Sequence, residues 1–480
     1  MTRKCRSFAM QIVRSALFLA AMCIPTAAQS ATVPADFAAK VDAIVQRELE
    51  RQRVPGIEVG IAVDGAVVLQ RGYGTRDVRQ SLPVDDRTVF ALGSITKTFT
   101  AAAVMKLVAE HRLDLDAPLQ TYVPDAPHAR ELTVRSLVTQ TSGLADYVDA
   151  HDGLAVATQT DVLPAKLVAS ISEEALGFVP WTHFAYSNTN YLLLTAVVER
   201  ASGLAFSDYL RRGIVEPLHL SSLSYGRPES GSDVAVGYTR AFPAPVWSAA
   251  FSRGAGALWG SVADLLLLDE AFFGGRFLST ETVRTMTSKQ PLRDGVLSEY
   301  AFGWFVSELG GHKQLWHNGG VPGFSARNAV FPDDRLAVVV LGNSSTFDEE
   351  PIVRGVLGLI DPASTLRESP EPPAPVDDPA VNALARSVLA SVQSGTIDRT
   401  AYTAEANAAF TDAVIRSVGV QLAPLGTPSG MALLYRGYTG NLEQFVYRLS
   451  FGRLAVLERL DLDPSRKIAG LLFRPAQDAP

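Results

Sequence analysis

A proline-rich stretch in the last third of this 480-residue chain constrains its fold more than any other sequence feature. Proline fixes φ and lacks a backbone N–H, so neither a helix nor a strand continues through repeated prolines, which favour an extended, semi-rigid chain. We therefore predict a linker over residues 361–379, between a large region at 31–360 and a smaller one at 380–480. The prolines of this linker are Pro362, Pro370, Pro372, Pro373, Pro375 and Pro379.

The first thirty residues have the composition of a secretory signal peptide. A basic start precedes an apolar run at 15–24, which is shorter than the roughly 20 residues that cross a bilayer, and Pro25 and small residues follow it. We predict that residues 1–30 are removed on export, so that the mature protein is periplasmic or secreted. A buried N-terminal helix is the alternative, which the basic flank and the proline disfavour. Lipoprotein processing at Cys23 is disfavoured because the bulky Met22 precedes it.

Removal of this leader changes the charge and the cysteine content. The net charge moves from −7 to about −11, because the leader holds four basic residues and no acidic ones. Such an acidic chain argues against nucleic-acid binding, and no later apolar stretch approaches the length of a membrane span. Both cysteines, Cys5 and Cys23, leave with the leader, so we expect no disulfide, no thiol nucleophile and no thiolate-bound metal.

Two predicted hairpins lie at opposite ends of the large region. Runs 56–63 and 66–70 flank Asp64-Gly65, and runs 324–331 and 336–341 flank a turn at 332–335. We expect an antiparallel sheet built from both chain ends and an inserted all-α lobe, which together make a two-lobed α/β fold with a cleft between the lobes. The expected helices are 37–52, 97–111, 134–139, 164–171, 190–202 and 263–273.

The first of three short motifs is Ser94-x-x-Lys97, at the predicted start of a helix. This spacing puts the hydroxyl and the amine on the same helix face. The lysine can take the serine proton if burial lowers its pKa, and the helix N-terminus favours a developing oxyanion. The alternative is a helix-capping serine beside a solvated lysine.

The second and third motifs are weak when each is taken alone. A tyrosine such as Tyr186 can pass a proton to a leaving group, and the amide of Asn188 can hold both a lysine and a substrate. The alternative for this triplet is an ordinary helix start. His317-Asn318-Gly319-Gly320 ends a predicted strand in glycines that let another backbone approach closely, and the alternative is a loop with a surface histidine.

Taken together, the three motifs resemble those of the serine β-lactamase and penicillin-binding-protein superfamily. The nearest branch is that of the class C β-lactamases, D-alanyl-D-alanine carboxypeptidases and related esterases, and the similarity spans residues 37–345. The resemblance implies a β-lactamase/transpeptidase-like fold and an acyl-enzyme mechanism. Supporting segments are 111–118, 132–144, 254–264 and 300–304.

The same resemblance assigns a role to each motif residue. Ser94 would be the acylated nucleophile and Lys97 its proton acceptor, with Tyr186 as their acid/base partner; whether lysine or tyrosine takes the first proton stays open. The substrate-binding residues would be Asn188, His317, Asn318, Gly319 and Gly320, with the N–H groups of Ser94 and Gly320 as the oxyanion hole.

Several residues depart from the family pattern. His317 stands where many β-lactamases have lysine, and a neutral imidazole binds a carboxylate less well than a permanent cation does. This difference favours peptidase or esterase activity. Asn318 replaces a threonine, Gln140 stands at a common histidine position, and Trp181 replaces a glycine and is expected to narrow the pocket.

The C-terminal region is predicted to be a small α+β domain. A helix at 381–396 precedes strands at 431–438, 443–451, 453–461 and 467–473, an order that resembles the cone-shaped nuclear-transport-factor-2-like domains. No catalytic cluster is visible in this region, so its role stays open between binding, docking and stabilisation.

We therefore expect an exported serine hydrolase that cleaves an amide or ester bond in a D-amino-acid peptide, a β-lactam or a small ester. The alternative is a penicillin-binding-like sensor that binds without turnover. The seven histidines contain no H-E-x-x-H motif, and neither a G-x-S-x-G elbow nor a nucleotide-binding loop occurs. No metal and no cofactor are expected, the partner is a small-molecule or peptide substrate, and the oligomeric state stays open.

Overall fold

The computed structural model describes residues 33–149, 156–171, 175–228, 233–239, 242–366, 378–439, 442–452 and 454–475. The predicted signal peptide at 1–30 and the central part of the predicted linker, 367–377, lie outside the described residues.

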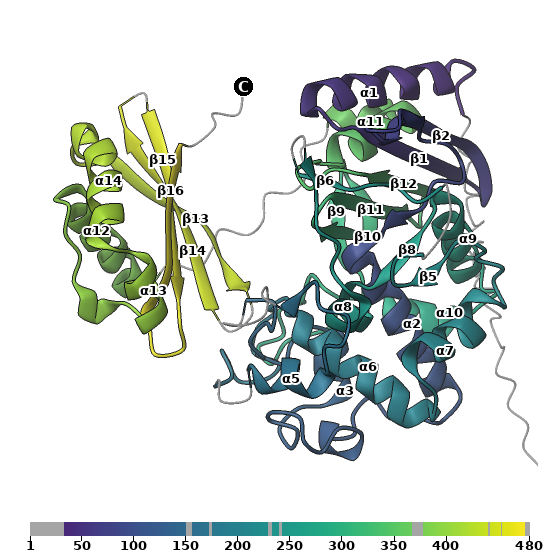
Figure 1. Cartoon of the computed structure of the whole chain (residues 1–480), viewed down its shortest axis with the longest axis horizontal. Coiled ribbons are helices and arrows are strands. Elements are labelled where there is room, and N and C mark those ends of the chain that lie inside the picture. The colour runs from purple at the N-terminus through teal and green to yellow at the C-terminus, as the bar shows by residue number, and fades with distance from the viewer. Residues whose placement is uncertain are drawn as a thin grey trace, which may run out of the picture.

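A seven-stranded antiparallel sheet forms the centre of the large region, in the order β3-β2-β1-β12-β11-β10-β9 (Figure 1). The two ends of the region meet where β1 pairs with β12, from Ile57 opposite Gly342 to Val63 opposite Leu336. The predicted sheet from both chain ends is thereby confirmed. Its strands are β1 (Gly56–Val63), β2 (Ala66–Asp77), β3 (Leu82–Pro83), β9 (Phe305–Leu309), β10 (His312–Val321), β11 (Phe324–Phe331) and β12 (Leu336–Gly342).

Helices cover both faces of this sheet, which explains why every residue of β1 is buried. Helices α1 (Phe37–Gln52) and α11 (Glu350–Ile360) lie together on one face (Figure 1). Their apolar residues form a core with Ile57, Val59 and Ile61, which alternate along β1. The residues between these three point to the opposite face, toward the inserted helices.

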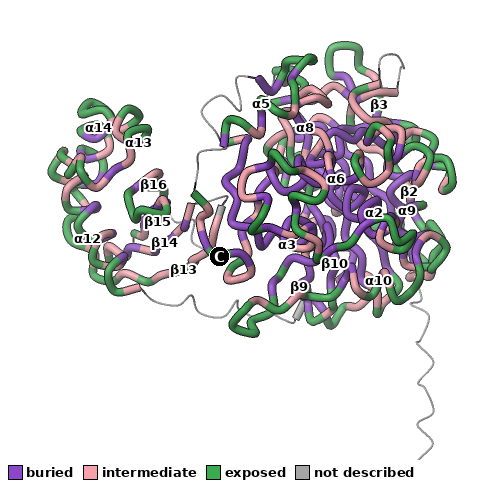
Figure 2. The backbone as a smooth tube through the Cα atoms, turned by 90° about the horizontal axis from the view of Figure 1, so that it is seen from below, coloured by how far each residue is buried: buried purple, intermediate pink, exposed green. Residues whose placement is uncertain are grey.

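The inserted lobe is helical, as predicted. Helices α2 and α6 run through the most buried part of the chain (Figure 2), and α2 is buried continuously from Thr96 to Met105. The helices are α2 (Thr96–Ala109), α3 (Val134–Val138), α5 (Pro164–Ala169), α6 (Asn188–Ser202), α7 (Phe206–Leu210), α8 (Ala249–Gly256), α9 (Val262–Phe273) and α10 (Thr280–Met286). Short strands accompany them: β4 (Phe90–Ala91), β5 (Ser224–Tyr225), β6 (Tyr238–Thr239), β7 (Phe242–Pro243) and β8 (Leu258–Gly260).

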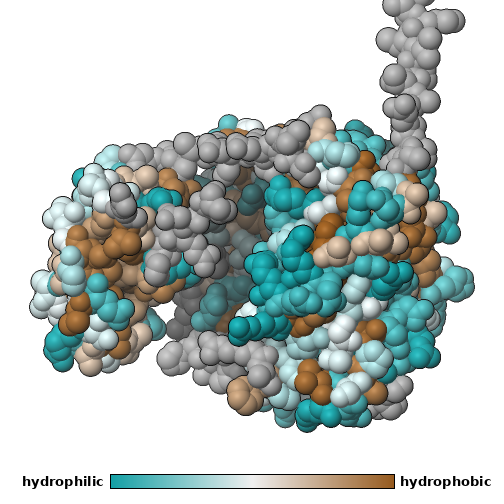
Figure 3. All heavy atoms as spheres, turned by 90° about the horizontal axis from the view of Figure 1, so that it is seen from above, coloured by the Kyte–Doolittle hydropathy of each residue, from teal (hydrophilic) through white to brown (hydrophobic). Residues whose placement is uncertain are grey.

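The C-terminal region has its own sheet and its own apolar core. Four antiparallel strands follow one another in chain order, and helix α12 packs on them through Val381, Ala385 and Leu389. The elements are α12 (Pro379–Gln393), α13 (Ala404–Ala409), α14 (Asp412–Leu422), β13 (Gly430–Thr439), β14 (Leu442–Phe451), β15 (Leu454–Leu462) and β16 (Ile468–Pro475). All four predicted strands are present. Figure 3 shows apolar residues gathered among polar ones on the visible face of this small domain.

The first part of the predicted extended linker is wrong. Residues Pro362–Leu366 form a 3₁₀ turn, and the buried Ser364 packs against Gly310. The side chain of Asp361 lies 3.0 Å from Nε2 of His312, so the large region extends as far as this turn. Within the described residues, no helix combines the length and the apolar character that a membrane span requires.

Candidate active site

Ser94 lies in a single 3₁₀ turn, η1 (Gly93–Ile95), which leads directly into α2. This turn is packed against strand β10 so closely that glycine is required there. A Cβ on Gly319 would lie 2.0 Å from the carbonyl oxygen of Leu92. The third motif therefore holds the turn that carries Ser94, through backbone contact.

Lys97 lies one residue into α2, with its side chain completely buried beside Ser94. Its Nζ is 2.9 Å from Ser94 Oγ, 2.8 Å from Asn188 Oδ1 and 2.7 Å from the carbonyl oxygen of Ala255. Burial lowers the pKa of Lys97 to about 7, and the negative charge of Asp146 opposes this decrease. An amine with this pKa is available as a base near neutral pH.

The amide of Asn188 is oriented by Asp146. Oδ2 of this carboxylate accepts from Asn188 Nδ2 at 2.8 Å and from the Asn188 backbone N–H at 3.0 Å. Because the amide nitrogen is held there, Oδ1 of Asn188 faces Lys97. Asp146 is buried, and burial raises its pKa.

Tyr186 lies above the lysine. Nζ of Lys97 is 4.8 Å from the centre of the Tyr186 ring, and the phenol is hydrogen-bonded to Ser94. Burial raises the pKa of Tyr186 well above its usual value, so the phenol keeps its proton. Gln140 holds the backbone beneath this residue, because its Oε1 accepts from the N–H of Ser187 at 3.1 Å.

His317 is buried behind the site and is not the surface histidine of the alternative interpretation. Its Nδ1 lies 2.6 Å from the carbonyl oxygen of Asn318, which can only accept, so Nδ1 carries the proton. Nε2 accepts from the hydroxyl of Tyr300 at 3.0 Å. Burial, with the charge of Lys97 as a second cause, lowers the pKa of His317 to about 3. The imidazole is therefore neutral.

A cavity of about 140 Å³ opens beside Ser94. Of the predicted substrate-binding residues, Asn188 and Gly320 line it, whereas His317, Asn318 and Gly319 do not. A Cβ on Gly320 would meet nothing within 4 Å. The lining residues are Ser94, Tyr147, Val148, Asn188, Trp247, Ser252, Ala255, Gly256, Gly320 and Val321.

Comparison with known proteins decides the family. The family model described as Beta-lactamase matches residues 41–359, which is well over half of the chain. The chain belongs to the β-lactamase family.

Two solved structures and one curated protein show how far this likeness extends. Protein flp of Staphylococcus aureus (strain N315) is 25% identical over 320 residues, which cover 63% of this chain and 62% of that protein. The octameric penicillin-binding protein homologue from Pyrococcus abyssi is 25% identical, with a TM-score of 0.63, and the match covers 91% of this chain and 90% of that one. The D-stereospecific amidohydrolase from Streptomyces sp. is 25% identical, with a TM-score of 0.56. This match covers 65% of the present chain and 97% of the amidohydrolase. The chain thus spans about 62% of the length of the curated relative.

Sequence reasoning missed three parts of this β-lactamase-family site. Asp146 contacts Asn188, and the carbonyl of Ala255 contacts Lys97. Both contacts form only in the folded chain, and no sequence motif links the partners. Trp181 was expected to narrow the pocket, but the tryptophan that lines it is Trp247.

No group of three or more His, Cys, Asp or Glu side chains suited to a metal occurs in the described part of the chain.

Proposed function

We propose that this β-lactamase-family protein is a serine hydrolase that works through an acyl-enzyme on Ser94. The hydrogen bonds of Lys97 carry the proposal. Asn188 Oδ1 and the Ala255 carbonyl can only accept, so they take two N–H bonds of Nζ. A neutral amine has two N–H bonds and one lone pair, and the lone pair then faces Ser94 Oγ at 2.9 Å.

The proton follows a short path in this mechanism. Lys97 takes the Ser94 proton as Oγ bonds to the substrate carbonyl, and the N–H groups of Ser94 and Gly320 are the proposed oxyanion donors. The C–N or C–O bond then breaks. The leaving group receives a proton from Tyr186, which regains one from Lys97. Water hydrolyses the acyl-enzyme through the same groups. The raised pKa of Tyr186 supports lysine as the first base.

The proposed substrate is an amide or ester that carries no carboxylate. Among the described residues that line the Ser94 cavity there is no charged side chain, and His317 is neutral and buried behind it. A substrate carboxylate, as in a β-lactam or a free peptide C-terminus, therefore lacks a cationic partner at this cavity. The likeness to the Streptomyces D-stereospecific amidohydrolase supports D-amino-acid amides as the first candidates to test.

A turnover panel tests this assignment. Purified protein is given a D-alanine nitroanilide, its L-enantiomer, a short-chain nitrophenyl ester, a D-Ala-D-Ala peptide and a chromogenic cephalosporin. We expect turnover of the D-anilide and the ester, slower turnover of the two carboxylate-bearing substrates, and no turnover by Ser94→Ala. Fastest turnover of the cephalosporin would contradict a preference for substrates without a carboxylate. A stable acyl-enzyme without turnover of any substrate would instead support the alternative function, a penicillin-binding-like sensor.

We also propose export, which rests on the sequence of residues 1–30 alone. Expression of the full chain in a Gram-negative host, followed by fractionation and N-terminal sequencing, tests it. A mature N-terminus near residue 31 in the periplasm or medium is expected, and an intact Met1 in the cytoplasm would contradict export.

A further inference from the structure

A second cavity, of about 460 Å³, lies between α9 and strands β1, β11 and β12. It shares no lining residue with the Ser94 cavity, and its volume is in the range of small-molecule sites, roughly 300–1,000 Å³.

Small residues on the sheet leave this space open. At Gly60 the helix touches the sheet, because a Cβ there would lie 2.2 Å from Cγ1 of Val262. Farther along, Ala62 pairs with Ala337 across β1 and β12, and these two short side chains lie opposite Leu266. The cavity is the gap that the two alanines do not fill.

Asp269 is the one lining residue of this cavity with an unsatisfied buried oxygen. Asp269 is only 3% exposed. Its Oδ1 accepts from Asn328 Nδ2 at 2.9 Å, whereas its Oδ2 has no hydrogen-bond partner among the described residues. A buried acceptor without a partner is destabilising, and a donor on a bound molecule would remove that cost. Burial raises the pKa of Asp269 to about 7.

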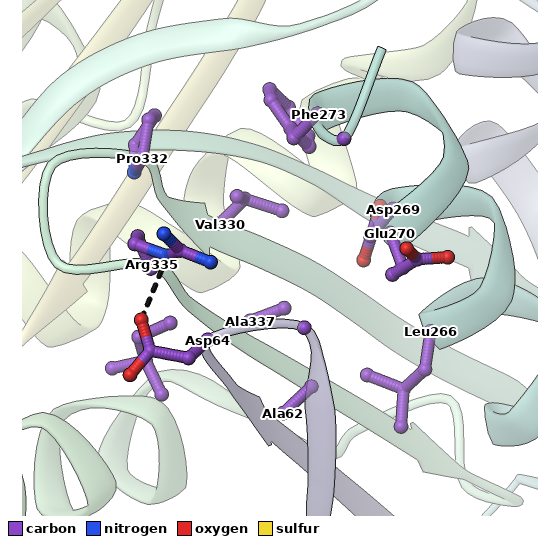
Figure 4. A pocket seen from close by; sticks show the side chains of 13 residues that line it. Ala62, Asp64, Leu266, Asp269, Glu270, Phe273, Val330, Pro332, Arg335 and Ala337 are labelled. Atoms are coloured by element: carbon purple, nitrogen blue, oxygen red, sulfur yellow. Dashed lines mark ion pairs between the residues drawn. The ribbon is translucent and has the colours of Figure 1, made fainter. Parts of the chain in front are cut away.

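The other charged groups around the cavity are paired. Figure 4 shows Asp269 and Glu270 on the α9 side and the Asp64–Arg335 ion pair on the opposite side. Arg335 Nε lies 2.7 Å from Asp64 Oδ1, and Glu270 is paired with Arg276. The cavity therefore holds more acidic than basic groups, around an apolar surface made by Leu266, Phe273 and Val330.

We propose that this cavity binds a small organic amine, whose ammonium group donates to Oδ2 of Asp269 and whose apolar body packs on Leu266, Phe273 and Val330. The ammonium donates to the one carboxylate oxygen of this lining that has no partner among the described residues, and the apolar body covers the rest of the lining. An anionic ligand would face three carboxylates and one guanidinium. The site is separate from Ser94 and does not depend on the hydrolase assignment.

Calorimetric titration of the full-length protein with benzylamine tests this site, with benzyl alcohol as the neutral probe of similar shape. At pH 8 benzylamine should bind at least about ten-fold more tightly than benzyl alcohol, because a charge-assisted hydrogen bond replaces a neutral one. At pH 5.5, where Asp269 is protonated, that advantage should disappear. Equal binding of the two probes at pH 8, or no binding of benzylamine, would overturn the proposal.

Two variants locate the binding. Asp269→Asn should weaken benzylamine at least about ten-fold at pH 8 and abolish the pH dependence, whereas the neighbouring Glu270→Gln, whose carboxylate is already paired, should bind within about two-fold of the original protein. If Asp269→Asn does not fold, a second variant, Ala337→Leu, fills part of the cavity from the β12 side and leaves Asp269 in place. Unchanged benzylamine affinity in either folded variant would show that the amine binds elsewhere and would overturn the proposal.

Discussion

At the scale of residues, the protonation state of Lys97 decides the chemistry. An ammonium at this position would have three N–H bonds, and Ser94 Oγ would have to accept the third. Burial lowers the pKa of Lys97 to about 7, so the amine predominates above that pH, and its two N–H bonds match the two pure acceptors around Nζ. Ser94 is then the donor, and its proton has a place to go.

The rate of Ser94 acylation should therefore follow the deprotonation of Lys97. Below about pH 7 the rate should rise about ten-fold per pH unit, and it should level off above that. The charge of Asp146 raises the pKa of Lys97, so Asp146→Asn should move the inflection to lower pH. Stopped-flow phosphonylation of Ser94 by a fluorescent fluorophosphonate, in which the serine oxygen displaces fluoride, measures both curves across pH 5–10. An inflection that moves upward in Asp146→Asn would contradict this electrostatic role.

Gly319 and Gly320 form a matched pair of tests for the packing behind Ser94. Gly319→Ala puts a Cβ against the Leu92 carbonyl, which should cost about 1–3 kcal/mol of stability and lower the acylation rate at least about 100-fold by moving the Ser94 turn. Gly320→Ala has room for its methyl group and should keep its melting temperature. Thermal unfolding and acylation rates of both variants give the comparison. Equal behaviour of the two would exclude this packing role.

The sequence predicted the motif residues Ser94, Lys97, Tyr186 and Asn188, which the fold brings together. It did not predict Asp146, because that contact depends on the path of the chain between α3 and α6. The substrate-binding role predicted for His317 is untested. Its side chain is buried and does not line the Ser94 cavity.

At the scale of elements, the periodic patterns were reliable and the short ones were not. Strand β1, β11 and helix α1 have the predicted bounds, because apolar residues mark them from end to end. Strands β4, β5 and β8 have only two or three residues each and carry no such pattern, and β9 was also missed. The linker prediction failed at Pro362–Leu366 because prolines are compatible with a 3₁₀ turn that packs on the large region.

Strand β15 contains a buried carboxyl that should make the small domain sensitive to pH. Both oxygens of Glu458 lack a partner among the described residues, and burial raises its pKa to about 8. The folded domain then holds a proton that the unfolded chain releases above about pH 4.5, so stability is lost as the pH rises toward 8. Glu458→Leu should remove this loss, which is up to about 4 kcal/mol at pH 8.

Calorimetry of the full chain at pH 5 and pH 8 measures this effect. The melting temperature of the small-domain transition should rise more in Glu458→Leu at pH 8 than at pH 5. An equal change at both pH values would mean that Glu458 is not the titrating group.

At the scale of the whole molecule, the small domain has an apolar core separate from the cores of the large region, which predicts two folding units. A chain that ends at Leu366 keeps the turn that packs on Gly310 and should fold with the melting temperature of the large region in the full protein. Aggregation of this shortened chain, or a melting temperature lower by more than about 5 °C, would show that the large region needs the small domain.

The small domain nevertheless contacts the segment that leads to the site. Tyr438 of β13 meets the rings of Phe178 and His183, each at 4.9 Å between centroids, shortly before Tyr186 in the chain. The turnover rate of the shortened chain should therefore differ from that of the full protein, even where the melting temperature of the large region is unchanged.

The central claim is that Ser94 forms a covalent acyl-enzyme, and intact-mass spectrometry tests it most directly. A fluorophosphonate loses fluoride to the attacking serine oxygen, so incubation should add the reagent mass less HF to the protein, as a phosphonyl group in the place of the acyl group. Peptide mapping should place this group on Ser94, and Ser94→Ala should stay unmodified while folding normally. A folded protein that gains no mass, or an adduct that persists in Ser94→Ala, would contradict the account.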